Sequence, residues 1–210
     1  MTQFERKHPG LNLGSHHGAA HDQAEALVFG FWVFLMSDLI IFGLMFATYI
    51  TMQGPMAEAG GPGPAQLYDL RSAWIQTLLL LTSSLTFGLA SLAMRHKHGV
   101  APVVVPLVVT LGLGLTFLGF ELHDFQGMLA QGAGPGRSGF LSAFFGLVPL
   151  HGLHVTAGCI WLMVMLAQIA VFGLSDMVKL RLLRLGLFWH FLDIIWIGIF
   201  SIVYLAGLTG

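Results

Sequence analysis

Two pairs of polar side chains have a spacing at which they could bind a metal ion or exchange protons. His151-x-x-His154 and His190-x-x-Asp193 each place two such groups three residues apart, so on a helix both members of a pair share one face. Imidazole and carboxylate groups are metal ligands, and Glu121 could complete such a shell. Both pairs occur in long apolar segments, so their chemistry depends on where those segments lie.

The composition is that of an integral membrane protein. Of 210 residues, 56% are hydrophobic and 9% are charged, and the mean hydropathy is +0.80. A typical soluble domain has about 25% charged residues, so these few charges could not cover a soluble fold of this size. The formal net charge of −1 argues against nucleic-acid binding.

Five apolar segments are each long enough to cross about 30 Å of hydrocarbon as a helix. The expected spans are residues 27–51, 72–94, 103–123, 140–172 and 185–208. The fourth is longer than needed, so we expect it to be tilted or to begin as an interfacial turn. Glycine-rich connectors are expected at 54–64 and 127–136. The chain thus divides into a polar, histidine-containing cytoplasmic tail (1–26) and an all-α transmembrane domain (27–210).

The basic residues of the loops orient these spans. With a cytoplasmic N-terminus, seven of the nine lysines and arginines fall on the inner side: Arg6, Lys7, Arg95, Lys97, Lys179, Arg181 and Arg184. The outer side then has Arg71 and Arg137. Since cytoplasmic loops are enriched in basic residues, we expect the N-terminus inside and the C-terminus in the periplasm.

Few ionisable side chains remain within the spans. The candidate polar framework is Asp38, Glu121, His151, His154, His190 and Asp193. Each is costly in hydrocarbon and should face other helices, water or lipid headgroups. We favour polar contacts between helices over a bound metal or haem, because the expected depths spread these groups over ~15 Å or more. Asp38 has no obvious basic partner at its depth.

Small residues mark positions where helices can approach closely. Ser84 and Gly88 form a small-xxx-small step in the second span, and Gly112 and Gly114 lie close together in the third. We interpret them as packing positions.

Several motifs together resemble subunit III of the haem–copper oxidases. They occur in the family's order and are Ser37-Asp38, Phe120-Glu121, His151-Gly152-Leu153-His154 and Trp189-His190-Phe191-x-Asp193-x-x-Trp196. Within the family, the five-helix length and residues 136–145 look most like the quinol-oxidising cytochrome bo type.

The resemblance implies a non-catalytic accessory subunit of a proton-pumping oxidase that oxidises ubiquinol and reduces O2 to water in the bacterial inner membrane. Haem and copper would then lie in subunit I, the principal partner, with subunits II and IV and phospholipid as further partners. This chain would stabilise the catalytic subunit, bind lipid and support proton uptake. Asp38 matches the family's carbodiimide-reactive carboxyl position. Arg71, Arg137 and Trp189 are candidates for lipid or partner contacts.

Three alternatives remain open at this stage. The donor could be cytochrome c, in which case the chain is subunit III of a cytochrome c oxidase. A small proton-coupled transporter would use the intramembrane acids as a relay, and a membrane enzyme would carry its own histidine-ligated metal.

Overall fold

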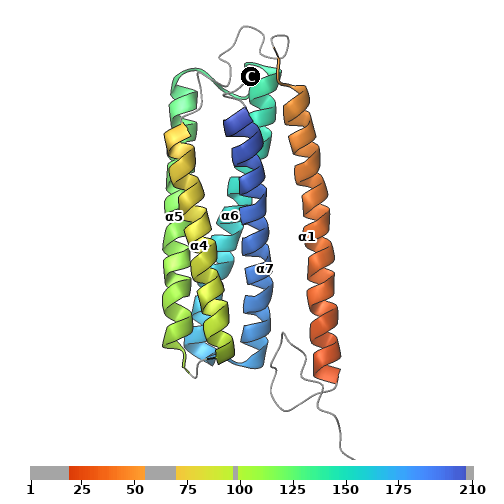
Figure 1. The fold of residues 1–210 in the computed structure, drawn as a ribbon, viewed down its shortest axis with the longest axis vertical. Coiled ribbons are helices and arrows are strands. Elements are labelled where there is room, and N and C mark those ends of the chain that lie inside the picture. The colour runs from red at the N-terminus through yellow and green to blue at the C-terminus, as the bar shows by residue number, and fades with distance from the viewer. Residues whose placement is uncertain (1–18, 55–69, 97–98, 207–210) are drawn as a thin grey trace, which may run out of the picture.

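The structure of the chain is a computed structural model that describes residues 19–54, 70–96 and 99–206, with side chains from residue 26 onward except at positions 95 and 96. This part of the chain contains five long helices (Figure 1): α1 (Ala19–Thr51), α4 (Leu70–His96), α5 (Ala101–Ala130), α6 (Gly139–Phe172) and α7 (Asp176–Ile199). The π-helical segment η1 (Phe200–Leu205) continues α7. Tail residues 1–18 and most of the first glycine-rich connector lie outside the described residues.

The five helices alternate in direction, and α7 lies at the centre of the bundle (Figure 1). It packs against α1, α4 and α6, while α5 packs against α4 and α6. Helix α1 stands at one side, where it contacts α6 and α7. The sequence prediction of an all-α bundle with five membrane-spanning helices is confirmed for the described part of the chain.

Three helices extend well beyond their predicted spans. Helix α1 begins at Ala19, within the predicted polar tail 1–26, rather than at 27. Helix α5 continues to Ala130, past the predicted end at 123, and α7 begins at Asp176 rather than at 185. Hydropathy marks the part of a helix that lies in hydrocarbon, whereas the backbone helix continues through polar turns until a residue stops it. The short connection before α7 contains such a stop, because Gly173 has φ 65°, which ends α6.

Helix α6 is continuous over its 34 residues, through Pro149. Its first turn is capped by Ser138, whose hydroxyl accepts a hydrogen bond from the Leu141 N–H at 3.1 Å. The helix therefore begins with a capped turn directly after the α5–α6 connection.

Glycines allow the large aromatic side chains of α7 to lie inside the bundle. Trp189 is 2% exposed and packs beside Gly114 of α5 and Gly158 of α6. A Cβ at Gly114 would lie 2.9 Å from the Trp189 ring, and one at Gly158 would lie 3.2 Å from it. The predicted packing role of Gly114 is thus confirmed, whereas a Cβ on Gly112 would meet nothing within 4 Å.

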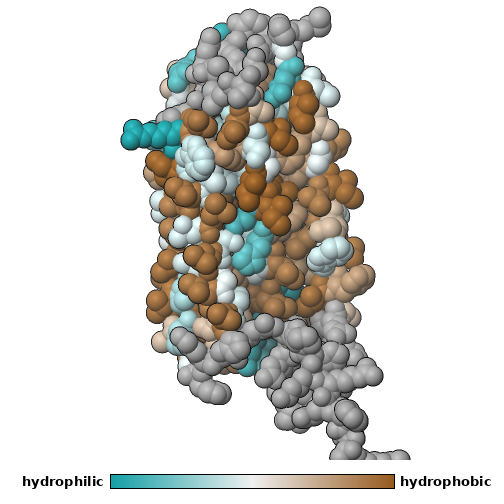
Figure 2. Space-filling model, viewed as in Figure 1, coloured by the Kyte–Doolittle hydropathy of each residue, from teal (hydrophilic) through white to brown (hydrophobic). Residues whose placement is uncertain are grey.

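The outer surface at mid-height is hydrophobic (Figure 2). Exposed leucine, isoleucine, valine and phenylalanine side chains come from every long helix. Such a surface suits acyl chains or other membrane helices rather than water.

Candidate functional site: polar side chains inside the bundle

Glu121 and His151 lie in the interior where α5, α6 and α7 meet. Glu121 is 4% exposed and sits beside Gly152, and His151 is fully buried. The His151 Nε2 is 3.2 Å from the backbone oxygen of Leu192 on α7. Because a carbonyl oxygen only accepts, Nε2 carries the proton and Nδ1 of the neutral ring is an acceptor. Neither Nδ1 nor Glu121 Oε1 has a hydrogen-bond partner among the described residues.

A second polar group joins α4 to the later part of α5. The Asp124 carboxylate accepts hydrogen bonds from Ser72 Oγ and Gln76 Nε2, both at 2.7 Å. Tyr204 of η1 is within electrostatic range of both Asp124 and Glu121. Asp124 and Glu121 therefore belong to one polar region near the end of the bundle where α4 begins.

A third group joins α4 to α7. The His190 Nδ1 lies 2.7 Å from Ser84 Oγ, and the Ser84 hydroxyl also interacts with the Asp193 carboxylate. The sequence placed His190 and Asp193 on one face of a helix and predicted polar contacts between helices for both. In the structure both side chains interact with Ser84 of α4.

Asp38 and His154 form a pair between α1 and α6. The His154 Nε2 lies 3.8 Å from Asp38 Oδ2, and both side chains are largely buried. The expectation that Asp38 lacks a basic partner is therefore wrong. His154 Nδ1 donates to the Leu150 carbonyl at 2.8 Å, which leaves Nε2 facing the carboxylate. A bare nitrogen and a carboxylate would repel, so the contact is favourable when the pair carries one further proton.

The structure brings the framework residues closer together than their expected depths suggested. The depth argument treated His151 as remote from the His190–Asp193 segment, yet its ring bonds to Leu192, directly beside Asp193. Helices α6 and α7 run antiparallel. Because α7 begins at Asp176 rather than at 185, His190 and Asp193 lie near the middle of the helix rather than near its start. Even so, no group of three or more His, Cys, Asp and Glu side chains within the described residues could hold a metal ion.

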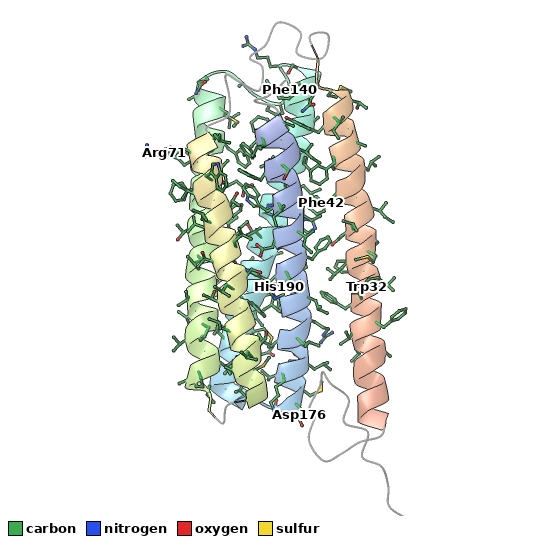
Figure 3. All side chains as sticks on the ribbon, viewed as in Figure 1. Trp32, Phe42, Arg71, Phe140, Asp176 and His190 are labelled. Atoms are coloured by element: carbon green, nitrogen blue, oxygen red, sulfur yellow. The ribbon has the colours of Figure 1, made fainter. Side chains whose placement is uncertain are left out.

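The three candidate contact residues have different positions. Arg71 and Arg137 are exposed at the end of the bundle where α4 and α6 begin, and Figure 3 labels Arg71 there. Trp189 is buried, and its indole N–H donates to Ser83 Oγ at 3.0 Å. A contact of Trp189 with lipid or a partner is therefore excluded, because α5 and α6 cover its ring.

Sequence reasoning missed the neutral partners of the framework. These partners all lie on α4 and are Ser72, Gln76, Thr77, Ser83 and Ser84. The Thr77 hydroxyl accepts a hydrogen bond from the indole N–H of Trp196 at 3.0 Å. Hydroxyl and amide groups have a lower free-energy cost in a membrane than charged groups, so a single one of them in a span does not indicate a polar site. A signal was present in their spacing, because positions 72, 76, 77, 83 and 84 recur on one side of a helix.

Comparison with known proteins identifies the family. A model of the family described as cytochrome c oxidase subunit III matches residues 9–208. The chain belongs to the cytochrome c oxidase subunit III family. The resemblance seen in the sequence motifs is thus confirmed.

Relatives within the subunit III family match this chain over nearly its full length. A Pseudomonas aeruginosa protein named cytochrome bo(3) ubiquinol oxidase subunit 3 is 45% identical over 195 residues, 93% of this chain and 92% of the relative. A Pseudomonas putida protein of the same name is 46% identical over 187 residues, 89% of each chain. Cytochrome c oxidase subunit 3 of Alkalihalophilus pseudofirmus is 39% identical over 199 residues, 94% of this chain and 95% of the relative. This subunit III family member is a multi-pass protein of the bacterial inner membrane.

Proposed function

We propose that the chain is the accessory subunit III of a terminal ubiquinol oxidase. The observation that carries this proposal is the identity of 45% and 46% to two proteins named ubiquinol oxidase subunit 3, over about nine-tenths of each chain or more. Haem and copper would be bound by the large subunit I, with subunits II and IV completing the complex. The intramembrane polar groups support a structural role, since Asp38, Asp124, His151 and His190 each contact a hydroxyl, amide, carbonyl or histidine of a neighbouring helix.

A donor other than quinol is the second candidate. It is favoured by the 39% identity to a cytochrome c oxidase subunit 3. The chain would then have the same accessory role beside a catalytic subunit that accepts electrons from cytochrome c.

Isolation of the complex tests both candidates. A C-terminal affinity tag on this chain should retain, in mild detergent, a large haem- and copper-containing subunit. Oxygen uptake with a short-chain ubiquinol but not with reduced cytochrome c supports the first candidate, and the reverse supports the second. Loss of every oxidase subunit during isolation, or stoichiometric iron or copper in the purified chain alone, would contradict both.

We also propose that the N-terminus is cytoplasmic and the C-terminus periplasmic, as the seven-to-two distribution of basic residues predicts. Arg71 and Arg137 would then lie near the outer leaflet, where their guanidinium groups are suited to lipid phosphates. Alkaline phosphatase fused after the last residue should be active in the periplasm. An inactive phosphatase together with a fluorescent cytoplasmic reporter at the same position would reverse the orientation.

A further inference from the structure

His190 is exposed at the middle of a membrane span. It is the fifteenth of the 30 residues in the span Asp176–Leu205, about 20 Å from either end at 1.5 Å per residue. The other five members of the polar framework, namely Asp38, Glu121, His151, His154 and Asp193, are buried or half-buried. Figure 3 places His190 at mid-height on α7, and Figure 2 has a hydrophilic patch at that level within a hydrophobic surface.

The His190 ring contacts α4 through Nδ1, although the residue as a whole is exposed. Nδ1 is held by Ser84, and the ring edge meets Phe87 with centroids 6.0 Å apart. The direction of the Ser84–His190 hydrogen bond depends on the ring tautomer, and in either tautomer Nε2 is a donor or an acceptor that Ser84 does not satisfy. An acyl chain offers neither a donor nor an acceptor, and lipid headgroups lie too far from the centre of the span to reach Nε2.

The surface beside His190 is shaped for close approach of a helix. Gly88 lies one turn from Ser84 on the same side of α4, and a Cβ built there would meet nothing within 4 Å. By contrast, the corresponding space at Gly114 and Gly152 is filled by Trp189 and Glu121 of this same chain. The described residues therefore do not fill the space beside Gly88, and two apolar side chains are exposed, Leu85 (64%) next to Ser84 and Ile194 (65%) one turn beyond His190 on α7. Small-xxx-small steps bring transmembrane helices into close contact.

We propose that this face of α4 and α7 is the docking surface for a transmembrane helix of another subunit of the oxidase. That helix packs over Gly88 and presents a hydroxyl or amide group to His190 Nε2, because either group can donate to the ring nitrogen or accept from it. The inference rests on the proposed function, because it requires a partner subunit. Leu85 and Ile194 supply the apolar part of the contact, while His190 supplies the hydrogen bond that lipid cannot satisfy.

A substitution at the open glycine tests this surface. Gly88→Leu adds a side chain where a Cβ meets no described residue within 4 Å, so packing among the described helices should be unchanged, while close approach of the partner helix is blocked. The matched control is Gly112→Leu on α5, where a Cβ also meets nothing within 4 Å. We expect Gly88→Leu to reduce retention of the partner subunit in detergent about tenfold relative to this control.

A second measurement does not depend on how Gly88→Leu folds. Replacing Ile194 by p-benzoyl-L-phenylalanine and irradiating native membranes should cross-link this chain to another oxidase subunit. If the wild-type tagged chain retains the oxidase but Gly88→Leu behaves like its control, or Ile194 cross-links to lipid or to a second copy, the docking surface is overturned. If the wild-type chain retains no oxidase subunit, it is the proposed function that fails.

Discussion

The Glu121 carboxylate of α5 lies in the notch left by Gly152 of α6. A Cβ built on Gly152 would come within 2.9 Å of both Cδ and Oε1 of Glu121. The adjacent residue, His151, bonds to the Leu192 carbonyl of α7. One turn of α6 thus contacts α5 through Gly152 and hydrogen-bonds to α7 through His151, so it sets how these three helices pack together.

Gly152→Ala should therefore destabilise the α5–α6 contact. The added methyl would overlap a carboxyl group that is 4% exposed and has little space to move, and overpacking of this kind costs about 1–3 kcal/mol. We expect a lower midpoint for thermal unfolding of the purified complex. Gly112→Ala, at an open position, is the control. Equal midpoints for the two variants would mean that Glu121 moves aside freely.

Asp193→Leu should weaken assembly more than Asp193→Asn. Asparagine keeps an acceptor for the Ser84 hydroxyl, whereas leucine leaves the Ser84–His190 contact without its third member. Hydrogen bonds between membrane helices contribute about 0.6 kcal/mol on average and up to about 1.7 kcal/mol. The measurement is the subunit ratio of the isolated complex, with turnover followed in parallel. A leucine variant with a normal ratio but no initial turnover would contradict a structural role for Asp193.

The number and order of the spans could be predicted from the sequence because each apolar segment carries its own signal. Pairing between helices could not. Whether His154 meets Asp38 depends on which helices are neighbours and how each is rotated, and α1 reaches α6 across a chain separation of more than a hundred residues. The link through Ser84 was missed because a serine in an apolar segment is typical of helix packing. The sequence around Ser84 does not distinguish a serine that only permits close packing from one whose hydroxyl contacts two side chains of another helix.

The Asp38–His154 pair should behave as a coupled unit. Asp38→Asn can still donate to the bare Nε2 of His154, so we expect assembly to be intact and sustained turnover at most shortened. His154→Phe leaves the Asp38 carboxyl without this partner, and Asp38→Leu in the same chain should restore part of the loss. Neighbouring polar residues show coupling energies of about 0.5–3 kcal/mol, measurable from unfolding midpoints of the two single variants and the double variant. Additive effects would show that the 3.8 Å contact contributes nothing, and a variant unable to reduce the haems would show a different role for Asp38.

The packing of Trp189 against two glycines predicts a compensating pair of substitutions. Trp189→Phe removes the indole donor to Ser83, whose hydroxyl keeps its bond to the Leu80 carbonyl at 2.7 Å, so the cost should be small, about 1 kcal/mol plus a small cavity. Gly114→Ala alone should be more harmful, because its Cβ would lie 2.9 Å from the rigid Trp189 ring and 3.1 Å from Cys159 Sγ. Combined, the smaller phenylalanine leaves room for the added methyl, so the double variant should unfold at a higher temperature than Gly114→Ala. If the double variant lowers the unfolding temperature by the sum of the decreases in the two single variants, Trp189 is not what limits the space at Gly114.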